Sequence, residues 1–154
     1  MSNTQNSSSN VQQDGEGELL PNFVEDNHLT PIKIDFPDNF RIKPDGIYKK
    51  PDGTIILAEV YVHQGPLKGS QPDKICADML KLITAQKILA KKGLKTELYI
   101  LLACEEAEKH FKGKSWHSAV VQHFDIHVEV DKLRPQTIEK IKQAQEKQKM
   151  VNAK

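Results

Sequence analysis

The run formed by residues 97–103, ELYILLA, most constrains the fold because every residue after Glu97 is apolar. A strand without polar alternation has no face for solvent, so it is expected inside a sheet that is covered on both sides. The run is far shorter than the roughly 18 apolar residues of a membrane span, and no other stretch approaches that length. It therefore predicts the buried central strand of an α/β domain.

Patterns elsewhere in the chain predict more strands. Residues 32–36 and 126–130 alternate apolar and polar side chains, as short strands do. Residues 41–50 and 54–63 flank a Pro-Asp-Gly turn, which predicts a β-hairpin.

Helices are expected between and after these strands. Apolar side chains recur at helical spacing within residues 70–92, and Gly93 is a suitable stop. Residues 105–111 and 116–124 predict two short helices, and a basic helix follows Pro135. The order predicts an α/β domain of the mixed type, with a central mixed sheet of about four to five strands that starts with a hairpin and is flanked by helices.

The ends of the chain differ in composition from its middle. Residues 1–30 contain five acidic residues and no lysine or arginine, and we expect a disordered acidic and polar tail. The folded α/β domain is expected over 31–133 and the basic helix over 134–154. Because the whole chain has a net charge of +1, the remainder after the tail carries +6, which suits either a phosphate backbone or ordinary surface lysines.

The sequence lacks the features of a secreted protein. The first residues lack the basic and apolar regions of a secretory signal. Cys76 and Cys104 have no partner at metal-binding spacing, so we expect free thiols in a reducing compartment. These features predict a cytoplasmic protein without a membrane anchor.

The hairpin carries the candidate chemistry. Asp45 precedes its first strand and Glu59 lies on its second, where alternation places Glu59, Tyr61 and His63 on one face. Two neighbouring carboxylates suit Mg²⁺, which takes oxygen ligands. The plainer interpretation is a turn residue and an edge-strand acid, since Pro51-Asp52-Gly53 repeats the tripeptide Pro44-Asp45-Gly46.

These residues resemble the PD-(D/E)xK nuclease superfamily. The resemblance rests on Pro44-Asp45 followed by Glu59-Val60-Tyr61 in a hairpin, helix and strand context, and it covers residues 31–130. It implies a restriction-endonuclease-like fold, a Mg²⁺ cofactor held by Asp45 and Glu59, DNA as partner, and a place in a bacterial restriction, repair or defence system.

The superfamily's lysine is absent from its usual position, where Tyr61 stands. The resemblance allows the lysine to come from elsewhere, and Lys68 and Lys74 are the catalytic candidates. Gln71 and Lys81 are expected to line the substrate site with Tyr61 and His63. Lys74, Asp78 and Lys81 lie at helical spacing, which also describes the solvent face of any amphipathic helix.

Two functions follow from this sequence. The first is a Mg²⁺-dependent phosphodiesterase that cleaves DNA, working as a homodimer or in a larger complex. The alternative is a catalytically inactive nuclease-like domain that binds nucleic acid or assembles with proteins. Trp116 is expected to pack rather than to stack on bases, and the histidines to be surface or core-edge residues. The basic C-terminal helix either contacts a partner or is solvated.

Overall fold

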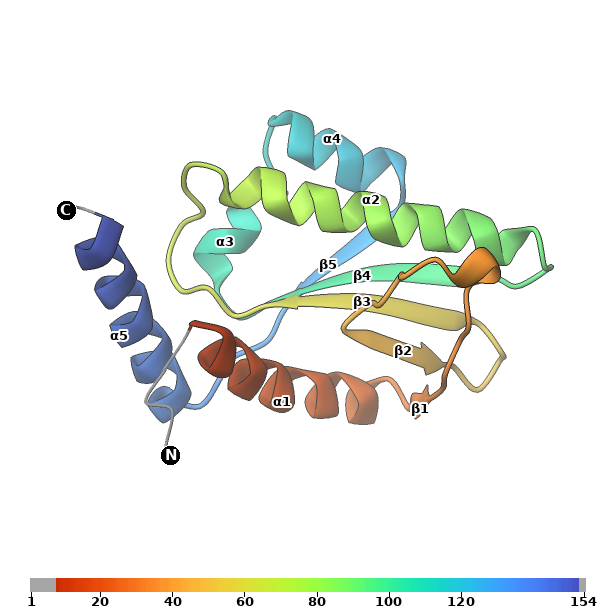
Figure 1. Ribbon diagram of the computed structural model, residues 1–154, viewed down its shortest axis with the longest axis horizontal. Coiled ribbons are helices and arrows are strands. Elements are labelled where there is room, and N and C mark those ends of the chain that lie inside the picture. Colours follow the sequence, from red (N-terminus) through yellow and green to blue (C-terminus); the bar gives the residue numbers. More distant parts are fainter. Residues whose placement is uncertain (1–7, 153–154) are drawn as a thin grey trace.

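A five-stranded mixed sheet forms the centre of this computed structural model, which describes residues 8–152 (Figure 1). Its strands, in spatial order, are β1 (Thr30–Pro31), β2 (Gly46–Lys49), β3 (Ile55–Tyr61), β4 (Thr96–Leu102) and β5 (Ile126–Val130). The first three pair antiparallel, whereas β3, β4 and β5 run parallel. The predicted α/β class with a mixed sheet is therefore confirmed, and residues 97–103 lie in its interior as expected.

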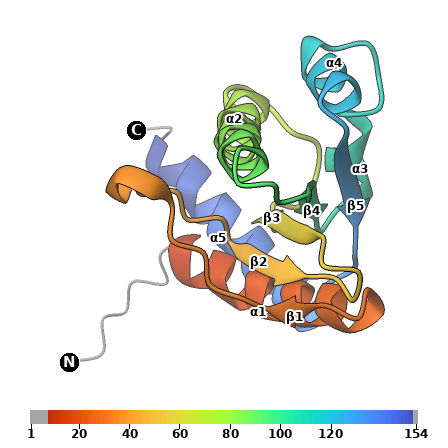
Figure 2. The same ribbon diagram turned by 90° about the vertical axis from the view of Figure 1, so that its right-hand side faces the viewer.

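Helices cover both faces of the sheet. They are α1 (Ser8–Asp26), the 3-10 turn η1 (Pro37–Asn39), α2 (Gln71–Ala90), α3 (Glu105–Lys109), α4 (Trp116–His123) and α5 (Pro135–Asn152). Figure 2 shows α2 and α4 on one side of the sheet, with α1 on the other side and α5 beside it. No helix within residues 8–152 combines the length and apolar character that a membrane crossing requires.

Strand alternation divides the core into two halves. On the α2 side, Leu57, Leu98 and Ile100 pack with Met79 and Leu82, and all five are fully buried. On the α1 side, the neighbouring strand residues Ile56, Ala58, Val60, Tyr99 and Leu101 form a second buried cluster. Glu59 belongs to the first face and is nevertheless buried among apolar groups.

The start of the sheet differs from the sequence prediction. Residues 32–36 form no strand, and β1 comprises only Thr30 and Pro31. A single backbone bond, from Ile32 to Ile47, continues the pairing at 3.2 Å. Ile32 and Ile34 still pack partly buried against the core, so their alternation reflects burial at the sheet edge rather than a ladder.

The predicted disordered tail is wrong for residues 8–26, which form α1; residues 1–7 lie outside the described part of the chain. Leu19 and Phe23 are one helical turn apart and are buried against the sheet. Phe23 packs on Tyr99 with ring centroids 5.0 Å apart and also contacts Tyr48 edge-on. Two large apolar side chains at that spacing suffice to dock a helix of low average hydrophobicity.

Acidic α1 also holds the start of α5. Glu18 accepts hydrogen bonds from the backbone and side chain of Arg134, at 3.0 and 2.9 Å, and from the Thr137 hydroxyl. Burial opposes ionisation of Glu18, but these hydrogen bonds outweigh it and lower its pKa. The carboxylate also lies at the positive end of the α5 dipole, which favours its charge.

Candidate metal and phosphodiester site

Asp45 is positioned by the end of the β2–β3 pairing. Gly46, the first residue of β2, lies opposite Ala58 on β3. Beyond that pair no β2 backbone remains, and the Asp45 carboxylate accepts the Val60 N–H at 2.9 Å. The side chain therefore satisfies a strand donor and is held beside Glu59.

Glu59 is the buried acid of the site, with only 3% of its surface exposed. Burial and a hydrogen bond with the carboxyl of Asp45 raise the pKa of Glu59 to about 8, against the lowering effect of Lys81. Two neighbouring carboxyl groups oppose each other's ionisation. Because Gly46 lies opposite Ala58, Asp45 precedes the strand at the level of Glu59; a shared metal site at the two acids stays a prediction.

Lys81 supplies the ammonium nearest to this pair. It extends from α2 and forms an ion pair with Oε1 of Glu59, and it lies 3.8 Å from Asp78. Its own burial lowers its pKa, but Glu59, Asp78 and Asp45 together raise it. The Lys81 side chain therefore stays charged and reaches the strand that lacks a lysine of its own.

Tyr61 occupies the position where the superfamily pattern has lysine. Its hydroxyl donates to Asp78, one turn before Lys81 on α2. Burial and this contact with Asp78 raise the pKa of Tyr61, so the phenol stays protonated. The pairs Tyr61–Asp78 and Glu59–Lys81 fasten α2 to β3 at two successive positions on the same face.

Helix α1 adds two groups that the sequence prediction missed. The Gln12 amide donates to the Val60 carbonyl and to Glu16, each at 2.8 Å. Burial raises the pKa of Glu16, Gln12 lowers it, and nearby Asp45 raises it further. A third carboxyl group therefore lies near Asp45, from the segment expected to be a tail.

The remaining predicted residues are held elsewhere. Lys68 and Lys74 are exposed, and within residues 8–152 neither forms an ion pair with Asp45 or Glu59. Gln71 accepts the backbone N–H of Lys68 at 2.9 Å and lies 3.3 Å from Nδ1 of His63. Burial lowers the pKa of His63. His63 and Gln71 thus brace the loop before α2 rather than contact the two acids.

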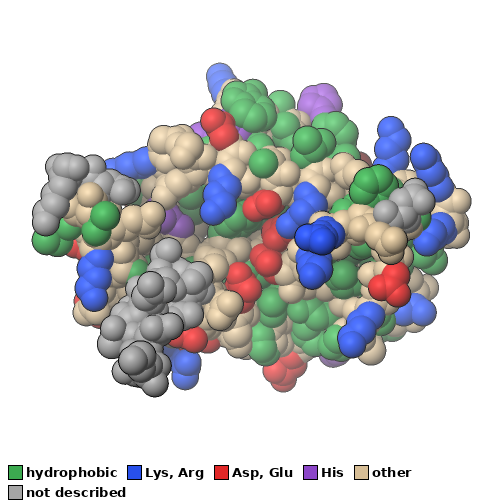
Figure 3. All heavy atoms as spheres, viewed as in Figure 1, with side chains coloured by type: hydrophobic (Ala, Val, Ile, Leu, Met, Phe, Trp, Pro, Cys, Tyr) green, Lys and Arg blue, Asp and Glu red, His purple; other side chains and the backbone are tan. Residues whose placement is uncertain are grey.

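The site has carboxylate oxygens, which are the kind of ligand that a hard divalent cation takes. The carboxyl groups of Asp45, Glu59 and Asp78 lie near one ammonium, that of Lys81. Oε1 of Glu59 contacts Lys81 and accepts no hydrogen bond from any other described residue. Figure 3 shows acidic side chains gathered below α2 with basic ones beside them. Among the described residues, no three His, Cys, Asp or Glu side chains form a ready-made metal cluster. A cation would therefore complete its shell with water or substrate oxygens.

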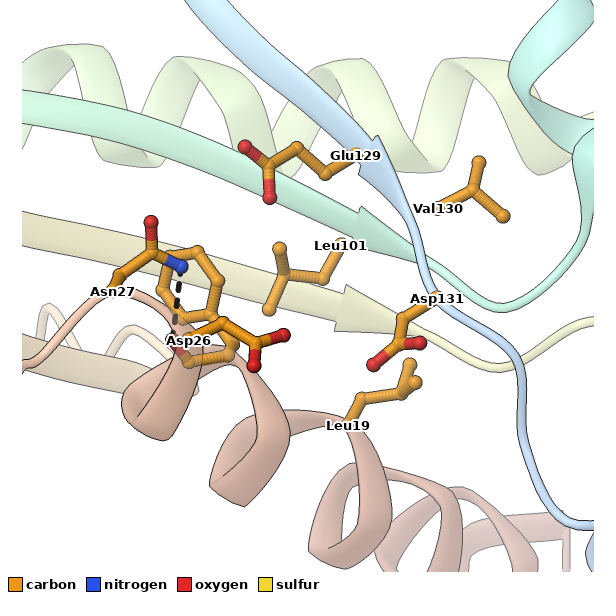
Figure 4. Close-up of a pocket in the computed structure, with 8 residues that line it drawn as sticks. Leu19, Asp26, Asn27, Leu101, Glu129, Val130 and Asp131 are labelled. Carbon is orange, nitrogen blue, oxygen red and sulfur yellow. Dashed lines mark hydrogen bonds between the residues drawn. The ribbon is translucent and has the colours of Figure 1, made fainter.

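A hollow of about 300 Å³ lies between α1 and the end of β5 (Figure 4). Leu19, Leu101 and Phe23 form its apolar floor, and Glu129 and Asp131 stand at its rim. Asp131 accepts the Asn22 amide at 3.4 Å, and both acids are exposed. These solvated acids lie on the α1 side of the sheet, away from Glu59.

Comparison with known proteins gives one distant structural similarity. No family model matches the sequence, and no curated protein matches it. The solved structure of EndoMS in its apo form is similar with a TM-score of 0.38 and 14% identity, over 76% of this chain and 44% of that chain. The chain thus spans less than half the length of EndoMS.

Proposed function

We propose that this protein is a metal-dependent phosphodiesterase of the PD-(D/E)xK type that acts on DNA. One observation carries the proposal: the buried Glu59 forms an ion pair with the ammonium of Lys81, and the neighbouring carboxyl of Asp45 raises its pKa. An isolated buried acid is costly in an apolar core and needs such partners. Two neighbouring carboxyl groups repel each other when both are ionised, and a divalent cation between them would offset that repulsion.

The acids have separate roles in this proposal. Asp45 and Glu59 would hold Mg²⁺, with Glu16 near enough to add negative charge. When bound, the ion offsets charge on the scissile phosphate and lowers the pKa of a coordinated water. Asp45 is fixed by the Val60 N–H at 2.9 Å, and Glu59 is fixed by burial in β3, so neither has to reorganise.

Lys81 would take the part of the missing strand lysine. Its charge is maintained by Glu59 and Asp78, and it can donate hydrogen bonds to an attacking water or to a phosphate oxygen. Asp78 is in turn oriented by the Tyr61 hydroxyl. Tyr61 is therefore a positioning residue, which accounts for a phenol in the place of the usual lysine.

The test is cleavage of linear and supercoiled DNA by the purified chain with Mg²⁺, Mn²⁺ or excess EDTA. We expect metal-dependent nicking that is abolished in Asp45→Asn and Glu59→Gln. Lys74→Met and Lys68→Met serve as matched controls, because both lysines are exposed and neither forms an ion pair with Asp45 or Glu59. Activity that survives in Asp45→Asn would assign the cleavage to a contaminant or to another site.

The alternative is a nuclease-like domain without catalysis, and Tyr61 favours it. Here the Lys81–Glu59 pair would be a structural link between α2 and β3. This alternative predicts DNA binding that is unaffected by EDTA and by Glu59→Gln, with no cleavage under any metal. Binding by a charged surface would weaken steeply as salt rises.

A further inference from the structure

Two stretches that run through or beside α2 and α4 are rich in exposed lysines, with the exposed acids Asp73 and Asp125 nearby. The two helices lie side by side in Figures 1 and 2, joined by a 2.8 Å contact between Asp73 and His117. No acidic residue occurs between Asp78 and Glu97 or between Glu108 and Asp125. The exposed lysines of these two stretches are Lys87, Lys91, Lys92, Lys95, Lys109, Lys112 and Lys114. Within residues 8–152, Lys112 alone among them forms an ion pair, with Glu108 at 3.1 Å.

Two aromatic side chains are exposed on this face, contrary to the packing role expected for Trp116. Trp116 is 59% exposed at the start of α4, and Phe124 is 49% exposed just after its end. Eight residues of helix place them about 12 Å apart along its axis. Exposed aromatic groups that contribute little to the core often mark binding sites.

The Trp116 ring is exposed and yet held in place. It stacks on the ring of His117, with centroids 3.9 Å apart and planes tilted by 32°. His117 is buried, and its two ring nitrogens are engaged by Asp73 at 2.8 Å and His110 at 2.9 Å. An aromatic surface with so little freedom loses little entropy when a flat ligand stacks on it.

A pocket of about 450 Å³ opens beside Phe124. Its apolar walls are Ile83, Ala90, Leu94 and Phe124, and its polar lining is Gln86, Lys87, Lys95 and Thr96. The Thr96 hydroxyl is buried and has no hydrogen-bond partner among the described residues. Thr96 therefore contributes to the pocket lining, but its hydroxyl is closed to solvent.

We propose that the α2–α4 face binds single-stranded nucleic acid, with one unpaired base in the Phe124 pocket and another stacked on Trp116. Flat bases suit the two aromatic groups, and the lysines suit the phosphates between them. The same face of a second copy fits less well, because the lysines of the two copies would repel each other. This site lies apart from the proposed catalytic acids, since Lys81 faces β3 whereas Ile83 and Lys87 line the pocket. Its occupation does not depend on cleavage.

Tryptophan fluorescence reports on this site directly, because Trp116 is the only tryptophan in the sequence. The experiment titrates the full protein with a short oligothymidylate in EDTA and follows tryptophan fluorescence. We expect saturable quenching, and weaker binding of a blunt duplex of equal length. Anisotropy of a labelled oligothymidylate then measures variants: Trp116→Ala and Phe124→Ala should each raise the dissociation constant roughly five- to hundredfold.

Phe40→Ala is the matched control, because Phe40 is 61% exposed beside η1, outside this face. It should bind as the wild type does. Equal binding by Trp116→Ala, Phe124→Ala and wild type, with loss only in Lys87→Ala and Lys95→Ala, would overturn base stacking in favour of charge alone. A concentration-dependent blue shift of Trp116 without nucleic acid would overturn the proposal in favour of self-association.

Discussion

Lys81 on α2 forms an ion pair with the buried Glu59 of β3, and the neighbouring carboxyl of Asp45 raises the pKa of Glu59. Asp45 directly precedes β2, Glu59 lies within β3, and Lys81 lies on α2. Their contact depends on the way in which α2 packs along the parallel pair β3 and β4, since Met79 and Leu82 on either side of Lys81 are fully buried. Four predictions follow from this arrangement and from the docking of α1.

Substitution of Lys81 distinguishes its proposed catalytic role from the roles predicted for Lys68 and Lys74. We expect Lys81→Met to lower the cleavage rate roughly 10²–10³-fold, because a preoriented donor at a phosphoryl site contributes about that much. Lys68→Met and Lys74→Met should remain close to wild type in rate. Single-turnover rates at saturating DNA and Mg²⁺ make the comparison, and equal losses in all three variants would contradict the assignment.

Magnesium should stabilise the fold through the two acids. A ligand that binds only the folded state raises the melting temperature increasingly as its concentration exceeds the dissociation constant. We expect Mg²⁺ to raise the Tm of the wild type and to have little effect on Asp45→Asn or Glu59→Gln. Differential scanning fluorimetry over a Mg²⁺ series measures this shift, with Glu129→Gln as a control acid on the α1 side of the sheet. A shift of the same size in every variant would indicate nonspecific ion binding.

Stability should fall as pH rises through the neutral range in the absence of metal. The pKa of Glu59 is raised from 4.5 to about 8 by burial and by Asp45, so between these values the folded state holds a proton that the unfolded state has lost. One such proton gives a slope of at most about 1.4 kcal/mol per pH unit. Urea unfolding of wild type from pH 5 to 9 in EDTA measures it. Glu59→Gln should flatten the slope, and identical slopes would refute the assignment.

Helix α1 should contribute to stability rather than behave as a tail. Leu19 is 1% exposed, so Leu19→Ala should lower the free energy of unfolding by about 2–5 kcal/mol. Val151→Ala, at a 72% exposed position, is the control and should change it little. Chemical denaturation compares the two, and backbone hydrogen exchange over 8–26 provides an independent check. Rapid exchange throughout that segment would indicate that it is disordered.

Local patterns in the sequence determined most of the sheet and the α2 side of the protein. The apolar run at residues 97–103 predicted β4, because a strand without polar alternation must be covered twice. The turn at Pro51-Asp52-Gly53 joins β2 to β3 as expected, and helical spacing predicted α2 close to its observed ends. Asp45 and Glu59 were predicted as neighbours because hairpin geometry fixes which residues lie opposite each other.

Only the tertiary structure decided which partners those acids have. Lys74 and Lys81 lie on the same predicted stripe of α2, and the depth at which that helix docks determines that Lys81, not Lys74, reaches Glu59. The segment 8–26 has few apolar residues, so its local composition could not reveal that Leu19 and Phe23 find a complementary surface on the distant strands β3 and β4. Gln12 and Glu16 reach the site because these long-range contacts, together with those of Glu18 with α5, hold α1 in place.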